Sequence, residues 1–310
     1  MPPRLTANDL GVLIGHWSDP TAATGCTVVL CPRGAVGAAA VRGGAPCSRE
    51  TEILALTRGV DPRLVHGVVL AGGSVFGLAA CDGVVRWLSE RSIGLQTGHA
   101  CIPIVPALGL YDLGVGDPHR WPDAEAGYAA CANARRTPPG EGRIGAGTGA
   151  SVGKAAGMER SSRGGIGIAR RPVAGGVVVE AIVAVNAFGE VVDPANGRIV
   201  AGVRAGRGRG FEPIDRILAG AGSTPFGNTT IGVVVTDATL SREDAADLAA
   251  QAHDGLARTI RPVHTRVDGD ALIVLATGRR RPRTSMIDLI ALQHQAVEAV
   301  SAAVLRAVTV

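Results

Sequence analysis

The feature that most restricts the fold is a long apolar run, Gly176–Asn186, with the sequence GVVVEAIVAVN. Only Glu180 interrupts its apolar character before Asn186. A strand with one solvated face would alternate apolar and polar residues, whereas this run is apolar at almost every position. It therefore predicts a central strand covered on both faces, followed by a turn at Gly189.

Other strand-like segments are shorter and alternate with helical patterns, which indicates a mixed α/β protein. We expect these strands at Thr27–Leu30, His66–Leu70, Thr229–Thr236 and Ala271–Thr277. A segment rich in Gly, Arg, Pro and Ser, Ala205–Gly227, indicates a long surface connection. No internal repeat is evident, so the whole chain, 1–310, is predicted to form a single catalytic domain.

Helices are expected where apolar residues recur at helical spacing. The first is Ser74–Ser89, with Ser74 as its cap. The second runs from Ser241 to about Arg258, because Ser241 and Asp244 form a capping-box-like start. The last begins near Ser285 and carries on one face three apolar residues, Ile290, Val297 and Val304.

Charge and composition argue against nucleic acids and membranes as partners. The net charge is +4 with scattered cations, and aromatic residues make up 3%, so a basic face with stacking groups is not expected. The longest uncharged apolar stretch, Gly67–Cys81, is shorter than the about 20 residues that span a bilayer. The N-terminal segment lacks the apolar core of a signal peptide, which predicts a cytoplasmic protein.

Metal and cofactor sites are not predicted either. The six cysteines contain no Cys-x-x-Cys pair, and we expect them to be reduced and mostly buried. The seven histidines show no metal-binding spacing and are interpreted as ordinary polar or buried residues.

Two glycine-rich segments fail as known motifs. In Gly145–Lys154, a phosphate-binding loop would require Gly at 148 and Ser or Thr at 155, where the chain has Thr148 and Ala155. In Gly72–Gly77, a nucleophile elbow centred on Ser74 would require Gly in place of Phe76.

The junction Pro225–Ala238, PFGNTTIGVVVTDA, carries a more specific chemical signal. If the peptide bond before Thr229 is cut, Thr229 gains a free α-amine beside its hydroxyl, which makes a nucleophile and base on one residue. The reference pKa of an α-amine is about 7.7–8.0, so part of it is neutral near pH 7. In the uncut chain the same hydroxyl can attack the carbonyl of Asn228. A β-branched strand residue after a turn is the plain alternative.

Seven segments in order resemble the DmpA-type aminopeptidases (L-aminopeptidase/D-esterase) and the nylon-oligomer hydrolases. They are GVLIGHWSDPTAATGCTVVLCP, VRGGAPCSRETEIL, VVLAGGSVFGLAACDGV, IPIVPALGLYDLGVGD, GRIGAGTGASVGK, VAVNAFGEVVDP and GNTTIGVVVTDA. The resemblance implies a four-layer α/β/β/α sandwich of the DmpA/ornithine acetyltransferase type. It also implies self-processing into 1–228 and 229–310 and assembly as a tetramer.

The resemblance also implies roles for individual residues. Thr229 matches the nucleophile and Asn228 the residue whose carbonyl is cleaved. Asn186 matches an asparagine whose amide donates to the oxyanion, a contact worth about 3–4 kcal/mol in comparable enzymes. Lys154 and Tyr111 match polar residues that line the same site.

An acidic pair, Asp268 and Asp270 in VDGDALIV, is placed beside the nucleophile by the resemblance. There it would orient the α-amine of Thr229 and raise its basicity. Taken alone, the Asp-Gly-Asp sequence is typical of a tight turn. The expected activity is hydrolysis of amide bonds in small peptides, amino-acid amides or related oligomers. The alternatives are an acyltransferase on the same scaffold and an unprocessed binding protein.

Overall fold

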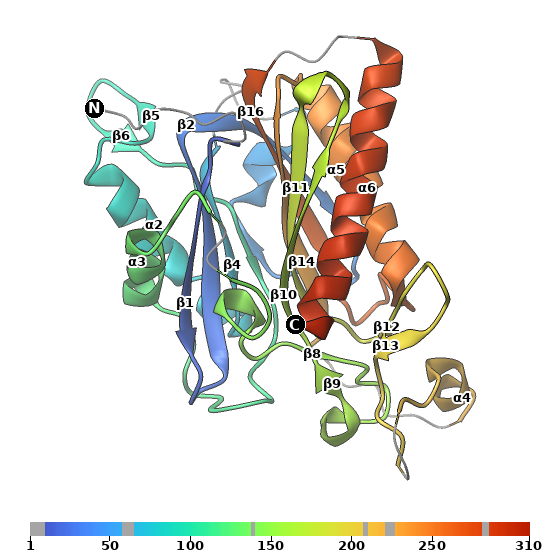
Figure 1. The fold of residues 1–310 in the computed structure, drawn as a ribbon. Coiled ribbons are helices and arrows are strands. Elements are labelled where there is room, and N and C mark those ends of the chain that lie inside the picture. The colour runs from blue at the N-terminus through green and yellow to red at the C-terminus, as the bar shows by residue number, and fades with distance from the viewer. Residues whose placement is uncertain (1–9, 58–64, 138–139, 207–209, 221–226, 281–284) are drawn as a thin grey trace.

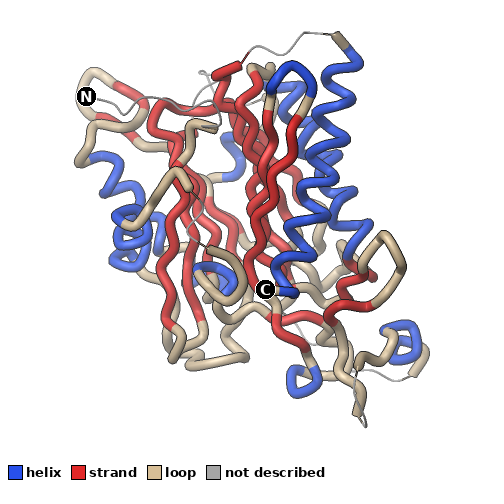
Figure 2. The backbone as a smooth tube through the Cα atoms, viewed as in Figure 1, coloured by secondary structure: helices blue, strands red, loops and turns tan. Residues whose placement is uncertain are grey.

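The computed structural model describes residues 10–57, 65–137, 140–206, 210–220, 227–280 and 285–310. Two β-layers are packed face to face between two helical layers (Figures 1 and 2). The helices α2 (Ala80–Ser89) and α3 (Ala124–Ala132) cover one outer face. The helices α5 (Arg242–Thr259) and α6 (Met286–Thr309) cover the other. The arrangement is therefore a four-layer α/β/β/α sandwich.

The strands of both layers form one hydrogen-bonded path, in the order β10-β11-β14-β16-β2-β4-β7-β3, with β1 paired to β2. The long strand β2 belongs to both layers: Cys26–Leu30 pairs with β4, and Val36–Val41 pairs with β16. The path comprises β1 (Leu13–Asp19), β2 (Thr24–Val41), β3 (Ser48–Arg49), β4 (Val65–Ala71), β7 (Ala107–Gly109), β10 (Gly165–Pro172), β11 (Val178–Asn186), β14 (Thr229–Ala238) and β16 (Ala271–Arg280).

Short elements complete the chain between these layers. The helices are α1 (Ser74–Gly77) and α4 (Ile214–Leu218). The strands are β5 (Leu95–Gln96), β6 (Cys101–Ile102), β8 (Ser151–Val152), β9 (Ser162–Arg163), β12 (Glu190–Val192), β13 (Ile199–Ala201) and β15 (Ile260–Arg261).

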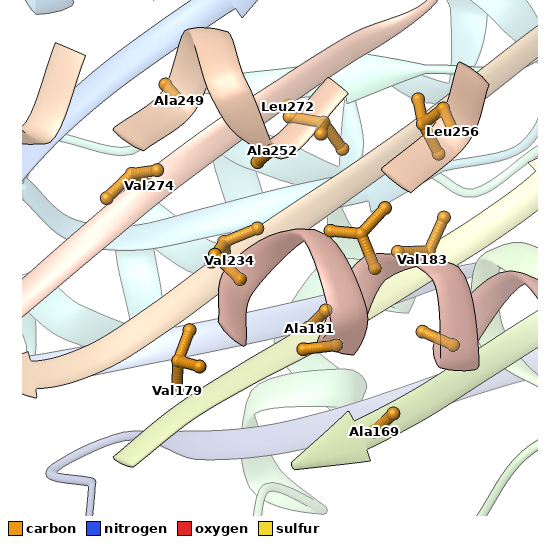
Figure 3. Close-up of a cluster of buried hydrophobic side chains, with 14 of the residues drawn as sticks. Ala169, Val179, Ala181, Val183, Val234, Ala249, Ala252, Leu256, Leu272 and Val274 are labelled. Carbon is orange, nitrogen blue, oxygen red and sulfur yellow. The ribbon is translucent and has the colours of Figure 1, made fainter. Parts of the chain in front are cut away.

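Alternation along the central strands fills two different cores. On β14, Ile231, Val233 and Val235 point into the core between the β-layers, and Val234 points into the core beneath α5 and α6. On β11, Val179, Ala181 and Val183 belong to the core beneath α5 and α6 (Figure 3), and Ile182 and Ala184 belong to the core between the β-layers. Both strands are thus buried on both faces, and for β11 this confirms the prediction made from the apolar run.

Two helices begin at the serines where the sequence predicts their starts. The side chain of Ser241 accepts a hydrogen bond from Asp244 N at the start of α5, and Ser285 does the same for Asp288 N at the start of α6. Val297 and Val304 are buried, but Ile290 is 50% exposed, because near the start of α6 it is Leu289 and Leu292 that pack against the core.

The expected helix at Ser74–Ser89 is wrong in two respects. It is broken into α1 and α2, and Ser74 does not cap it. Gly73 is the N-cap residue, no side-chain hydrogen bond caps α1, and Ser74, its first residue, adopts a φ of 54°. All six cysteines are free. Within the described ranges, no helix is long and apolar enough to cross a bilayer.

Candidate active site

The site lies where β11 ends and β14 begins, in the interior between the two β-layers. Thr229, the first residue of β14, stands directly opposite Asn186, the last residue of β11. Because side chains alternate along a strand, Thr229 points to the same face as Ile231, and Asn186 to the same face as Ala184. Antiparallel register therefore brings the two polar side chains together in a buried position.

The hydroxyl of Thr229 contacts the peptide bond that precedes it. Its Oγ1 donates a hydrogen bond to the carbonyl oxygen of Asn228. The same oxygen accepts a second hydrogen bond from the backbone N–H of Gly269, at 2.8 Å. A donor at this place stabilises negative charge on the oxygen if the carbonyl is attacked.

Gly269 fits here because it has no side chain. A Cβ at this position would lie 2.5 Å from the carbonyl oxygen of Ala45 and 2.9 Å from Thr229 Oγ1. Gly269 was not among the residues that the sequence predicted for the site. Its backbone N–H leaves no residue-type signal, and the only sign was a glycine between two aspartates.

Lys154 is buried beside the strand ends. Its Nζ donates to Asn186 Oδ1 at 2.7 Å, to Asn186 O at 2.9 Å and to Gly227 O at 3.1 Å. Burial lowers the pKa of Lys154 to about 7, and the carboxylates of Asp268 and Asp112 act in the opposite direction. Three acceptors around one Nζ match the three N–H bonds of an ammonium group.

The side-chain amide of Asn186 is fully hydrogen-bonded. Its Nδ2 donates to Tyr111 O at 2.9 Å and to Gly227 O at 3.3 Å. Its Oδ1 accepts from Ser151 N at 3.0 Å as well as from Lys154. In this uncut chain the amide therefore faces the carbonyl of Gly227, and the carbonyl of Asn228 is held by Gly269.

The ring of Tyr111 packs against Gly227. Gly227 has a φ of +98°, and a Cβ there would lie 2.4 Å from Tyr111 Cδ1. Tyr111 is 40% exposed, so this residue is where the site approaches the surface. The next residue, Asp112, is buried and accepts from Gly73 N at 2.7 Å. Burial raises the pKa of Asp112 to about 6.

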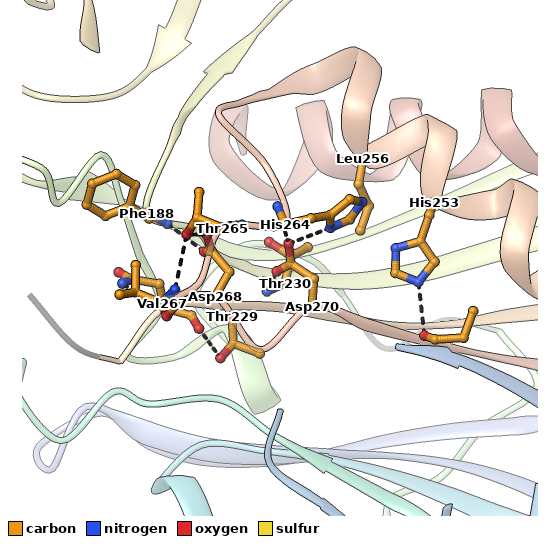
Figure 4. A network of polar contacts seen from close by, with 12 residues as sticks. Phe188, Thr229, Thr230, His253, Leu256, His264, Thr265, Val267, Asp268 and Asp270 are labelled. Atoms are coloured by element: carbon orange, nitrogen blue, oxygen red, sulfur yellow. Dashed lines mark hydrogen bonds and ion pairs between the residues drawn. The ribbon is translucent and has the colours of Figure 1, made fainter. Parts of the chain in front are cut away.

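The acidic pair forms the other wall of the site (Figure 4). Asp268 accepts from Phe188 N at 3.1 Å, from Thr265 N at 3.2 Å and from the hydroxyl of Thr265. Asp270 accepts from Thr230 N at 2.7 Å. Burial raises the pKa of Asp268, and the neighbouring Asp270 adds to the effect.

The tight turn that an Asp-Gly-Asp sequence favours is not found at these residues. The turn lies earlier, at Arg266 and Val267, and Asp268 forms an isolated parallel bridge with Asn228. This bridge aligns Gly269 N with the carbonyl of Asn228.

All seven residues that the sequence singled out converge on one site: Tyr111, Lys154, Asn186, Asn228, Thr229, Asp268 and Asp270. The structure adds Ser151, Gly227, His264 and Gly269, none of which the sequence predicted. Within the described ranges, no three His, Cys, Asp or Glu side chains are grouped so as to hold a metal ion.

The four-layer sandwich, with these polar groups at the start of a central strand, is a fold of the N-terminal nucleophile hydrolase type. The solved L-aminopeptidase D-Ala-esterase/amidase of Ochrobactrum anthropi, described as a variant of that fold, superposes with a TM-score of 0.72 at 21% identity, covering 97% of this chain and 85% of the other. A Burkholderia sp. beta-aminopeptidase gives a TM-score of 0.67 at 24% identity, covering 97% of this chain and 86% of that structure.

The chain belongs to peptidase family S58, whose sequence pattern matches residues 8–310. An uncharacterized aminopeptidase of Mycobacterium tuberculosis is 44% identical over 285 residues, which cover 86% of this chain and 80% of the relative. A 6-aminohexanoate-oligomer endohydrolase of Kocuria sp. is 35% identical over 275 residues, covering 86% of this chain and 73% of that enzyme. The protein is accordingly a hydrolase that acts on peptide or amide bonds.

Proposed function

We propose that the chain cuts itself between Asn228 and Thr229 and that Thr229 then serves as the nucleophile of an amide hydrolase. The observation that carries the proposal is the contact of the Thr229 hydroxyl with the carbonyl of Asn228, at the start of a buried strand. The N–H of Gly269 on the same carbonyl oxygen supports it.

In the first step, Thr229 Oγ1 attacks the carbonyl carbon of Asn228. The negative charge that develops on the oxygen is stabilised by the N–H of Gly269. The C–N bond then breaks, the hydroxyl proton passes to the departing nitrogen, and an ester links Asn228 to Thr229 Oγ1. Water opens this ester, which leaves a carboxylate on Asn228 and a free α-amine on Thr229.

In the mature enzyme, the α-amine of Thr229 acts as the base for its own hydroxyl. The substrate's acyl oxygen takes the place that the carbonyl of Gly227 occupies before cleavage. Two donors already point at this place, Lys154 Nζ at 3.1 Å and Asn186 Nδ2 at 3.3 Å. This geometry supports Asn186 as the oxyanion donor for substrate, while Gly269 serves self-cleavage.

The substrate class is the amides of small peptides, amino acids or amino-acid-like oligomers. The support is that one relative is named an aminopeptidase and another a 6-aminohexanoate-oligomer hydrolase. A screen of the cleaved protein with amino-acid amides, β-amino peptides, D-residue substrates and aminohexanoate oligomers distinguishes these possibilities. Addition of a competing amine shows whether the acyl group passes to water or to an amine.

Intact mass and N-terminal sequencing test the self-cleavage. We expect two fragments, Met1–Asn228 and Thr229–Val310, that remain together because β14 pairs with β11 of the larger fragment. A single chain that starts only at Met1 or Pro2 after long incubation contradicts the proposal and leaves a binding protein as the alternative.

A further inference from the structure

The carboxylate of Asp270 is held from two sides (Figure 4). Its Oδ1 accepts the N–H of Thr230, the residue after the proposed nucleophile, at 2.7 Å. Its Oδ2 accepts both the backbone N–H of His264, at 3.0 Å, and the ring Nδ1 of His264, at 2.8 Å. His264 thus contributes two of the three nitrogen contacts of this buried carboxylate.

We propose that His264 is a positioning residue for the reaction: its ring Nδ1–H fixes the carboxylate of Asp270 against the start of β14. The proposal rests on the proposed function of Thr229. His264 acts through Asp270, which orients the backbone at Thr230 and, after cleavage, the α-amine of Thr229. Unlike the acidic pair, His264 carried no signal in the sequence.

The tautomer follows from the contacts. An ionised carboxylate only accepts hydrogen bonds, so the ring nitrogen facing Asp270 must carry a proton. The other ring nitrogen, Nε2, is buried and has no hydrogen-bond partner among the described residues. The tautomer with its proton on Nδ1 satisfies both conditions, because it leaves no buried N–H without an acceptor.

Three N–H donors surround the carboxylate of Asp270, two from His264 and one from Thr230. Burial raises the pKa of the neighbouring Asp268, and Asp270 adds to this effect, so the two carboxylates of the pair interact.

The backbone of His264 adopts an uncommon conformation, which supports a specific role for this residue. His264 has a φ of 56°, in the left-handed region that residues with a side chain rarely adopt. This conformation is part of the loop that joins β15 to β16, and Gly44 N donates to the carbonyl of Thr265 in it.

The ring packed against His264 is that of another histidine, His253. The ring of His253, from α5, packs edge-on at 4.9 Å between centroids and donates through Nε2 to Ala40 O at 2.9 Å. Burial lowers the pKa of His253 to about 4, so this ring is uncharged at neutral pH. Arg42 lowers the pKa of His253, and Asp268 raises the pKa of Lys154.

Two variants separate the ring donor from the backbone conformation. His264→Asn places an amide N–H near the position of Nδ1, and His264→Gly has no donor, yet both residues tolerate a positive φ. On fully cleaved protein assayed with an amino-acid p-nitroanilide, we expect His264→Gly to lose kcat by about tenfold or more and His264→Asn to recover most of it. His253→Gln, which keeps the bond to Ala40, is the matched control.

A spectroscopic measurement tests the contact without enzymatic activity. In ¹⁵N-histidine-labelled Thr229→Ala protein, which remains uncut, one ring should be Nδ1-protonated with a low-field proton signal. Asp270→Asn should remove this signal. The inference is overturned if the signal is absent, or if His264→Gly is as active as His264→Asn. If cleaved wild-type protein hydrolyses none of the substrates while the proton signal is present, the proposed function is contradicted. The contact between His264 and Asp270 is still supported in that case.

Discussion

The backbone N–H of Gly269 donates to the carbonyl oxygen of Asn228 at 2.8 Å. The parallel bridge between Asn228 and Asp268 fixes this donor in place before any bond is broken. A preorganised donor of this kind is worth about 3–4 kcal/mol of transition-state stabilisation in comparable enzymes. The uncut chain therefore already contains the electrostatic arrangement that an attack by Thr229 needs.

Substitution of Thr229 tests the attack. Thr229→Val keeps the β-branched shape of a strand residue but has no hydroxyl, so we expect neither cleavage nor hydrolysis. Thr229→Ser should retain part of both, and Thr229→Ala should block both. Fragment masses and amide hydrolysis are the measurements. Cleaved and active Thr229→Val protein is incompatible with the mechanism.

Gly269→Ala tests the donor that we propose to serve self-cleavage. The added Cβ meets Ala45 O at 2.5 Å and Thr229 Oγ1 at 2.9 Å, and must displace the nucleophile or the loop. Self-cleavage should slow by about 10²-fold or more, as for loss of one oxyanion donor. Gly206→Ala is the control, because a Cβ there has no atom within 4 Å. Equal cleavage rates for the two variants would remove Gly269 from the mechanism.

Patterns of apolar residues were sufficient to predict the central part of the fold. The run ending at Asn186 and the strand starting at Thr229 were each expected from local sequence, and both are buried on two faces. The strand β2 was only partly predicted, at Thr27–Leu30. Pro32 and Gly34 suggest a strand end, but the chain continues through a register shift between Leu30 and Ala35.

Most side chains of the candidate site were predictable, whereas its backbone groups and the ring of His264 were not. Thr229 was indicated by the junction and by the resemblance, and Asn186 by the resemblance, yet their pairing depends on strand register, which only the structure gives. The donor at Gly269 is a main-chain N–H, and every residue except proline has one. His264 reaches Asp270 through a loop conformation, for which no residue spacing is diagnostic.

Asn186→Ala tests the donor that we propose to face the substrate. If Asn186 Nδ2 contacts the acyl oxygen mainly in the transition state, kcat should fall by about 10²–10³ with a smaller change in KM. Ser151→Ala is a companion variant with a smaller expected effect, because it removes only the 3.4 Å contact of the Ser151 hydroxyl with Asn186 Oδ1 and keeps the backbone N–H contact. Kinetics should be measured on protein confirmed as cleaved. A change confined to KM would instead assign Asn186 to ground-state binding.

The raised pKa of Asp112 leads us to expect that stability depends on pH. Burial raises its pKa from 3.8 to about 6, so between these values the folded state binds more protons than the unfolded state. The free energy of unfolding should therefore fall as the pH rises from about 4 to 7. Asp112→Asn cannot ionise at this position. The difference between its free energy of unfolding and that of the parent should therefore grow with pH, to at most about 3 kcal/mol. Urea denaturation in the uncut Thr229→Val background measures this, and an advantage that shrinks as the pH rises contradicts it.

Gly227→Ala should change self-cleavage and hydrolysis in opposite directions. In the uncut chain, the carbonyl of Gly227 accepts hydrogen bonds from Lys154 and Asn186, and a Cβ on Gly227 would collide with the ring of Tyr111. In the variant, this collision should move Gly227 away from its two donors. The neighbouring Asn228 carbonyl would then be displaced, and self-cleavage would slow.

After cleavage the same segment remains tethered to the large fragment, and its high effective concentration makes it a competitor of the substrate for the two donors. Cleaved Gly227→Ala protein should therefore show a lower KM than cleaved wild-type protein, because the competing carbonyl is displaced by the collision with Tyr111. Self-cleavage rates from fragment masses and KM from hydrolysis of the same substrate give the two readouts. A higher KM together with slower self-cleavage would mean that Gly227 only supports the local structure and does not occupy the position of the substrate's acyl oxygen.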